Sequence, residues 1–155
     1  MSTGGDMGTF ELGTDGPRII LVGVDGSTTS YHAAAYAWGL ARRQGSHLIV
    51  CYAANAGTAT AFVPSAAASA REAGEQTAAE LRDELDRAVR QLPVAVPYTF
   101  RSEIGDPATV LTRVADEVRA DAVVVGASAQ AGHRLIGSVA VRLVRAGRWP
   151  VTVVP

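Results

Sequence analysis

Short runs of almost wholly apolar residues alternate along this chain with longer stretches in which apolar residues recur at helical spacing. Continuous apolar runs suit strands that are buried on both faces, as in a parallel sheet covered by helices on either side. Three consecutive valines between small residues, Val123–Val125, are one example. Four such runs are predicted to be strands, at residues 18–24, 47–53, a run that ends at 126, and 151–154. A fifth strand is predicted at 98–104, where Tyr, Phe, Ser and Ile alternate with Thr, Arg and Glu, as in an outer strand with one wetter face.

Four helices are predicted between the strands, over residues 27–44, about 69–91, from 107 onward, and 138–146. Their expected ends carry capping residues. Ser27 is an N-cap candidate for the first helix, and Gly45 follows its last residue. Asp106 precedes Pro107 at the start of the third helix, which suits an acidic cap and a proline at the first helical position.

The second of these helices is the longest, and one face of it is apolar. The stretch before it, residues 55–65, is a loop candidate of low charge. We expect the apolar face of the helix to lie buried against the sheet. This face consists of Ala78, Leu81, Leu85, Ala88 and Leu92.

The alternation of strands and helices predicts an α/β fold with one parallel sheet and right-handed crossovers. The 155 residues suffice for a single domain with a full core, since domains commonly have about 100–150 residues. We expect residues 18–155 to form this domain. Residues 1–17 are rich in Gly, Ser, Thr and Asp, and they are predicted to form a disordered leader.

Net charge narrows the class of binding partner that we expect, and cysteine content narrows the cellular compartment. The net charge of −1 gives no reason to expect nucleic acid or an anionic membrane as a partner. No apolar run approaches the roughly 20 residues that span a bilayer, and the N-terminus lacks a secretory signal pattern. Cys51, the one cysteine, is expected in the core, and it cannot form an internal disulfide. We therefore expect a cytoplasmic protein.

Two stretches of small and polar residues follow the first and the fourth strand. Open α/β sheets bind ligands beyond the carboxyl ends of such strands, where the strand order reverses. Asp25 and the 126–138 loop are therefore expected to face each other across one crevice. Gly137 and Ser138 would present a helix N-terminus that favours an anion such as a phosphate. Two roles without a ligand stay open: Asp25 stabilises the turn that follows it, and the loop is a tight connection that binds nothing.

Four separated pieces of this sequence resemble the universal stress protein family. They are Val-Gly-Val-Asp-Gly-Ser at residues 22–27, Gly-Asp-Pro at 105–107, Gly-Ser at 137–138 and Pro-Val-Thr-Val-Val-Pro at 150–155. The resemblance covers residues 18–155. It implies a five-stranded, doubly wound, adenine nucleotide alpha hydrolase-like sheet. It also implies a homodimer that pairs the last strands of two subunits through Val151 and Val153.

The family includes proteins that bind ATP and proteins that do not. The ATP binders carry a loop of Gly, two residues, Gly, nine residues, then Gly and Ser or Thr. Here Ala129 replaces the second glycine, and only residues 130–136 separate it from Gly137. If ATP binds, the resemblance places Asp25 near the ribose or the adenine and the backbone around Ala53 at the adenine edge. It places the phosphates at Gly126, Gly132, Gly137 and Ser138.

His133 and Arg134 lie in the shortened part of this loop. They are either cationic phosphate contacts or a pair that faces solvent. The resemblance implies a non-catalytic regulator of the stress response that binds ATP in the crevice between the first and fourth strands. The alternative is the same fold without a nucleotide, which acts as a dimeric protein-interaction module.

An enzyme is not predicted. The order Gly126-Ala127-Ser128 after a strand is similar to the nucleophile elbow of serine hydrolases. However, Gln130 stands where that motif needs a glycine, and the one histidine beyond Ser128 is His133, with no acid between them. The sequence also lacks the Gly-Lys-Ser/Thr loop of P-loop enzymes.

Overall fold

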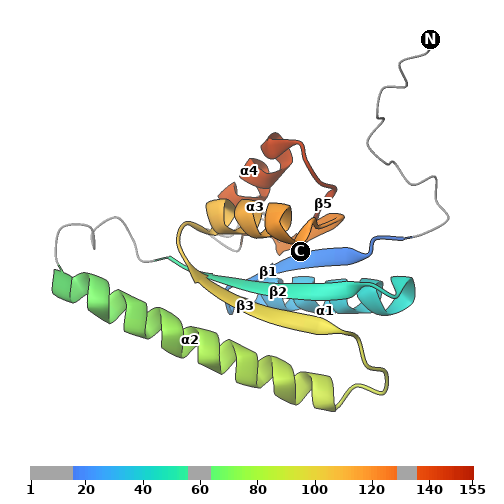
Figure 1. The fold of residues 1–155 in the computed structure, drawn as a ribbon, viewed down its shortest axis with the longest axis horizontal. Helices are drawn as coiled ribbons and strands as arrows, with labels where there is room; N and C mark the ends of the chain where they lie inside the picture. The colour runs from blue at the N-terminus through green and yellow to red at the C-terminus, as the bar shows by residue number, and fades with distance from the viewer. Residues whose placement is uncertain (1–15, 56–63, 129–135) are drawn as a thin grey trace, which may run out of the picture.

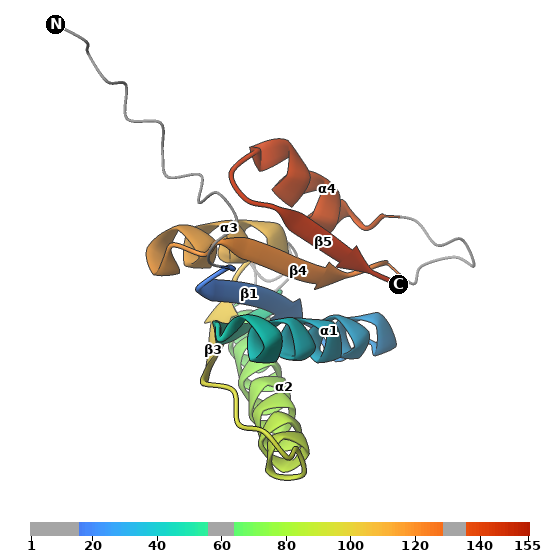
Figure 2. The same cartoon turned by 90° about the vertical axis from the view of Figure 1, so that its right-hand side faces the viewer.

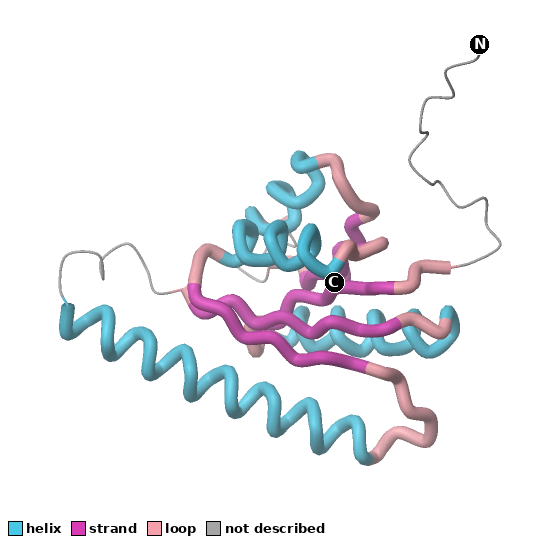
Figure 3. Tube along the Cα trace, in the orientation of Figure 1, coloured by secondary structure: helices cyan, strands magenta, loops and turns pink. Residues whose placement is uncertain are grey.

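The computed structural model describes residues 16–55, 64–128 and 136–155. Strands and helices alternate strictly through these ranges (Figures 1 and 3). In chain order they are β1 (Ile19–Val24), α1 (Thr28–Gln44), β2 (His47–Ala54), α2 (Pro64–Arg90), β3 (Tyr98–Ile104), α3 (Pro107–Val118), β4 (Ala122–Gly126), α4 (Ser138–Ala146) and β5 (Val151–Val154). The alternation that the apolar runs predict is confirmed.

The five strands form one parallel sheet in the order β3-β2-β1-β4-β5. β1 lies at the centre, where Ile20 pairs with Leu48 of β2 on one side and with Ala122 of β4 on the other. Figure 2 shows β1, β4 and β5 side by side. The chain builds outward from β1 to β3, then returns to the other side of β1, so the strand order reverses between β1 and β4. The predicted doubly wound α/β fold is confirmed.

The helices cover both faces of the sheet, with α1 and α2 on one face and α3 and α4 on the other (Figures 1 and 2). Successive side chains of β1 therefore pack into two separate hydrophobic cores, one on each face of the sheet. Ile20 and Val22 pack with Ala37 of α1, whereas Leu21 packs with Leu143 of α4. All of these side chains are inaccessible to solvent. Burial of each large aliphatic side chain stabilises the fold by about 1.5–3 kcal/mol.

The helix ends follow the predicted capping. Ser27 Oγ accepts a hydrogen bond from the Ser30 N–H at 3.2 Å, and Gly45 ends α1 with a φ of 69°. Asp106 Oδ2 accepts from the Thr109 N–H at 2.9 Å, and Pro107 begins α3. Caps of this kind satisfy N–H groups that have no partner within the helix.

The second helix differs from its prediction at both ends and on one face. It begins at Pro64 instead of Ser69, because the alanine-rich stretch 66–70 favours a helix and proline suits a first helical position. Figure 3 shows that this end of α2 extends past the strands. Near the other end, Ala88 and Leu92 are exposed, although the apolar pattern predicts them to be buried. The helix packs on β2 and β3 at its middle, and Gly74, Ala78 and Leu81 are the residues buried there.

Of the predicted leader, residues 1–15 lie outside the described residues, and only Gly16 and Pro17 are described. The Pro17 carbonyl accepts a hydrogen bond from the Ser46 hydroxyl at the start of β2. Within the described residues, none of the helices combines the length and the apolar character that a bilayer span requires.

Candidate binding site at the centre of the sheet

A cavity of about 180 Å³ lies at the carboxyl ends of β1 and β4. The helix after β1 covers one face of the sheet and the helix after β4 covers the other, so the connections diverge and leave a crevice between them. Strand ends form the floor, and the first turns of α1 and α4 form walls. The lining includes Gly23, Asp25, Cys51, Ala53, Gly126, Gly137 and Ser138.

The structure brings together five of the seven residues that the sequence singles out, from three strand ends and one helix. These five are Asp25, Ala53, Gly126, Gly137 and Ser138. The other two, Ala129 and Gly132, lie outside the described residues, as do His133 and Arg134. The sequence reasoning did not identify Gly23 and Cys51 as lining residues, because their place on the site side of the sheet depends on the pairing of β1 with β2.

Asp25 is exposed at the end of β1, and its carboxylate takes part in the turn that leads to α1. Asp25 Oδ1 accepts from the Ser27 N–H at 2.9 Å, across Gly26 with a φ of 82°. Burial raises the pKa of Asp25, but hydrogen bonds from Ser27 and Ser30 outweigh burial and hold the pKa below its ordinary value. The turn role is therefore observed. The same carboxylate lines the cavity, and it is ionised at neutral pH.

Gly126 has a packing role at the point where α1 meets the end of β4. A Cβ at this position would lie 2.6 Å from the carbonyl carbon of Thr29 and 2.8 Å from the Ser30 nitrogen. These are backbone atoms that cannot move aside cheaply. Nearby, Thr29 Oγ1 donates to the Ala127 carbonyl at 2.7 Å. The glycine is thus required by the contact between α1 and β4, whether or not a ligand binds.

The N-terminus of α4 forms the opposite wall. Gly137 is its N-cap, and it makes no side-chain capping hydrogen bond. Ser138, Val139 and Ala140, the first turn of the helix, all line the cavity. The N–H groups of a first helical turn have no acceptor within the helix. This wall therefore offers N–H donors and the positive end of the helix dipole to an anion.

The floor of the cavity is apolar and narrow. Cys51 is buried, and burial, with a smaller effect of the Glu103 charge, raises its pKa to about 11, so the thiol is protonated at neutral pH. A protonated thiol is a weak nucleophile. At Gly23, a Cβ would lie 2.9 Å from Leu111 Cδ1. Leu111 of α3 therefore packs directly against the backbone of β1, and a larger residue than glycine would not fit here.

The cavity holds few groups that exchange protons. Among the described residues that line it, Asp25 is the one carboxylate, and none is a histidine, lysine or arginine. A carboxylate with a lowered pKa is a weak base. The described ranges also contain no group of three or more His, Cys, Asp or Glu side chains that could hold a metal ion. Among the described lining residues, Asp25 is therefore the side chain that carries a charge at neutral pH.

The sheet order and the cavity at its reversal point define a doubly wound α/β protein with a candidate binding site at the switch point. Residues 17–155 match the model of the universal stress protein family, so the chain belongs to that family. A search of curated protein sequences finds no match.

Solved structures of the family share the fold. A universal stress protein from Burkholderia pseudomallei is 30% identical, with a TM-score of 0.64, and the match covers 89% of this chain and 96% of that one. UspA from Lactobacillus plantarum is 22% identical over 88% of this chain and 97% of that one, with a TM-score of 0.72. A universal stress protein in complex with cAMP is 28% identical over 90% and 97% of the two chains, with a TM-score of 0.57.

Proposed function

We propose that this chain is a non-catalytic regulator of the stress response that binds an adenine nucleotide, with ATP as the first candidate, in the switch-point cavity. One observation carries the proposal. The Asp25 carboxylate and the N-terminus of α4, at Gly137 and Ser138, line the same cavity. These walls complement the two ends of a nucleotide, because a carboxylate accepts hydrogen bonds from hydroxyl or amino groups and a helix N-terminus favours a phosphate.

The family resemblance assigns the parts of the nucleotide to residues. Asp25 would accept from the ribose or the adenine, and the backbone at Ala53, at the end of β2, would pair with the adenine edge. The phosphates would lie against Gly126, Gly137 and Ser138, together with Gly132 of the loop. The relative in complex with cAMP supports an adenine nucleotide as the class of ligand. The cavity is smaller than the roughly 300–1,000 Å³ that encloses a drug-sized ligand, so a nucleotide would extend past the described walls.

A regulator that binds and does not catalyse fits the chemistry of the lining. Asp25 has a lowered pKa, and Cys51 has a raised one. Neither is therefore suited to activate water at neutral pH. Any hydrolysis of bound ATP would be slow, because phosphoryl transfer needs positioned charges around the γ-phosphate.

The proposal includes a cytoplasmic homodimer that forms through β5. This strand lies at the edge of the sheet and pairs with β4 on one side. Val151 and Val153 are only partly buried against the core. An apolar edge strand is a template for a second strand, which the same strand of a partner would supply.

The alternative is the same dimer without a nucleotide, which acts as an interaction module. A specific observation favours it: Asp25 and Gly126 both have structural roles, one in the turn and the other in the contact with α1. Neither residue by itself therefore requires a ligand.

Isothermal titration with ATP–Mg²⁺, and separately with cAMP, distinguishes the two functions. The proposal expects saturable binding that Asp25→Asn weakens about tenfold through the loss of a charge-assisted hydrogen bond. Asp83→Asn, the same change at an exposed position of α2, should leave the affinity unchanged. Mass spectrometry of small molecules released from freshly purified, denatured protein provides a second readout. No binding at millimolar nucleotide and no released nucleotide would reject the proposal in favour of the interaction module.

A further inference from the structure

A second cavity, of about 340 Å³, lies on the other face of the sheet between α1 and α2. Strand residues form its floor, and the two helices form its walls. Trp38 of α1 and Leu81 of α2 are almost fully buried at its base. The lining consists of Val24, Tyr31, Ala34, Ala35, Trp38, Val50, Leu81, Glu84, Leu85, Ala88, Val89, Leu92 and Phe100. All but Tyr31 and Glu84 are apolar.

This cavity explains why the apolar face of α2 is only partly buried. Leu85, Ala88 and Leu92 belong to the face that the sequence predicts to be covered, and in the structure they line the cavity. One hydrogen bond bridges the two helices across it, from the Tyr31 hydroxyl to Glu84 Oε2 at 2.6 Å. Apolar walls around an unfilled space lose the dispersion contacts that a filled core would provide. An apolar occupant would restore these contacts.

The volume favours a small molecule. Pockets for small organic ligands measure about 300–1,000 Å³ and have mostly apolar linings with a few polar groups that fix the orientation. The space between α1 and α2 lies within this range and has such a lining. The exposed residues of the lining form the mouth. They are Tyr31, Ala35, Glu84, Ala88 and Leu92, of which Tyr31 and Glu84 are polar.

The charge at the mouth favours a cation. Glu84 is the one charged group among the described residues of the lining. The hydrogen bond to Glu84, then burial, then the negative charges of Glu84 and Asp25 raise the pKa of Tyr31 to about 12. The negative charges of two carboxylates, Glu84 and Asp25, thus both disfavour ionisation of the Tyr31 hydroxyl.

The cations on the adjacent part of α2 already have partners. Arg87, three residues after Glu84, donates from Nε to the Asp83 carbonyl at 3.3 Å. Arg82 lies over the ring of Phe100, 5.0 Å from its centroid, and donates to the Phe100 carbonyl at 3.4 Å. Two residues along a helix differ by about 200°, so Arg82 and Glu84 lie on opposite sides of α2. Arg82 therefore does not neutralise the mouth.

We propose that this cavity is a second binding site, which takes a small primary amine with an apolar body. The ammonium group pairs with Glu84 beside the Tyr31 ring, and the apolar body lies between Trp38 and Leu85. This site is separate from the switch-point cavity, and the proposal does not depend on nucleotide binding.

Titration with butyl-, hexyl- and octylammonium, followed by calorimetry or by shifts in the protein NMR spectrum, tests the proposal. Full burial of a methylene group tightens binding about fourfold, so we expect affinity to rise by about twofold to fourfold per methylene along the series. Octanoate, which has the same length and the opposite charge, should bind at least about tenfold more weakly. Affinity that is independent of length, or octanoate binding as tight as octylammonium binding, would overturn the proposal.

Variants at exposed positions of α2 locate the site without changing the core. Glu84→Gln should weaken octylammonium about fivefold and leave octanol unaffected, whereas Asp83→Asn should change neither. Ala88→Phe should fill the mouth and weaken both ligands, whereas Ala79→Phe, exposed on the same helix and outside the lining, should not. Thermal melts confirm that each variant is folded. Equal effects of a variant and its control would contradict the assignment.

A second copy of the chain is the competing occupant of this groove. Light scattering with and without octylammonium distinguishes the two. An unchanged molar mass at saturating amine supports a ligand site. A fall to half the mass would show that the groove is covered by a partner subunit, and the amine proposal would then be wrong.

Discussion

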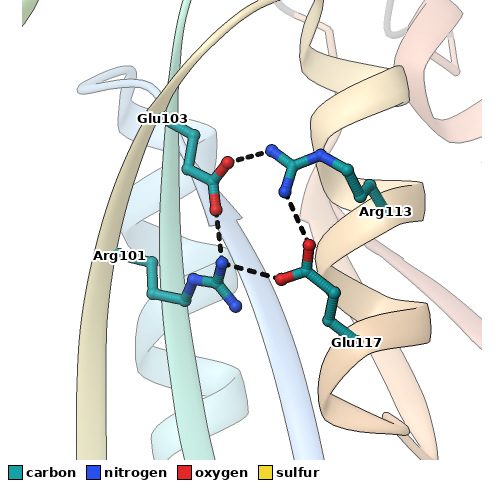
Figure 4. Close-up of polar contacts among 4 residues, drawn as sticks. All are labelled: Arg101, Glu103, Arg113 and Glu117. Carbon is teal, nitrogen blue, oxygen red and sulfur yellow. Dashed lines mark hydrogen bonds and ion pairs between the residues drawn. The ribbon is translucent and has the colours of Figure 1, made fainter.

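Arg101 of β3 and Glu117 of α3 form an ion pair, with 2.8 Å between Nη2 and Oε2. Arg101 also pairs with Glu103 at 2.5 Å, and Arg113 of α3 pairs with both glutamates. The four side chains close a ring of alternating charge (Figure 4). Because β3 is the edge strand on this side of the sheet, the ring connects the edge to a helix whose apolar residues pack on inner strands.

The ring predicts a loss of stability in acid. The hydrogen bond from Arg101, and next that from Arg113, hold the pKa of Glu117 below its ordinary value. A group whose folded pKa is lowered contributes stability that is fully present above its unfolded pKa, about 4.3 for glutamate, and lost as pH falls through the folded value. Glu117→Gln should therefore lower the Tm by about 1–3 °C at pH 7, since these side chains are partly exposed, and the difference should shrink as the pH is lowered below the unfolded value.

Thermal unfolding of the two proteins between pH 3 and pH 7 checks this prediction. Glu75→Gln, at an exposed position of α2, is the matched control and should give the same Tm as the unchanged protein throughout. A Glu117→Gln difference that stays constant from pH 7 to pH 3 would show that the ring contributes nothing through its charge.

A second prediction concerns the contact between α1 and β4. Gly126→Ala would place a Cβ 2.6 Å from the Thr29 carbonyl carbon, so the helix must shift. Overpacking of this kind costs about 1–3 kcal/mol in the free energy of unfolding, which urea denaturation measures. Gly39→Ala is the control, because its Cβ would meet only the far end of Arg43 at 3.8 Å in the middle of α1. It should stabilise the protein by about 0.5–1 kcal/mol. Equal effects of the two substitutions would disprove the close contact.

A third prediction separates the turn role of Asp25 from its charge. Asparagine keeps an oxygen that accepts from the Ser27 N–H, whereas alanine does not. Asp25→Ala should cost about 1–2 kcal/mol of unfolding free energy and Asp25→Asn less than about 1 kcal/mol at pH 7. Because the pKa of Asp25 is lowered, the contribution of its charge to stability is fully present above the ordinary aspartate pKa of about 3.9 and is lost as pH falls through the lower folded value. Urea denaturation at pH 7 and pH 3 tests both statements, and equal losses in the two variants would contradict the turn role.

Local patterns in the sequence determined most of the fold. Four of the predicted strands are apolar runs, the strand at residues 98–104 alternates apolar and polar residues, and most helix ends carry their own caps. The start of α2 was missed because proline and serine, its first two residues, suit both a loop and a first helical turn. Periodicity identifies which side chains are apolar, but it does not reveal whether another element covers them. For this reason Leu92 was predicted to be buried and is exposed.

The residues of the candidate site were also predicted from local sequence patterns. These patterns likewise do not reveal which distant elements contact one another. Sequence order places Asp25 and Gly137 after strands that become neighbours, so their meeting in one cavity follows from the topology. The contact that requires Gly126 involves the backbone of α1, about a hundred residues earlier in the chain, and no local pattern records it. The ring around Arg101 likewise depends on how α3 lies on the sheet.

The last prediction tests the proposed dimer. In a parallel pair, alternate residues of a strand direct both backbone groups to one neighbour. The Ala127 N–H donates to the Val154 carbonyl at 2.7 Å, so Val154 faces β4 and Val153 directs its N–H to the open edge. Val153→Pro removes this outward donor and leaves the β4–β5 hydrogen bonds in place. We expect it to convert a dimer into a monomer, measured by analytical ultracentrifugation, whereas Val153→Ala retains the N–H and should remain dimeric. A dimer that persists in the proline variant would exclude pairing through β5, because that interface requires this N–H.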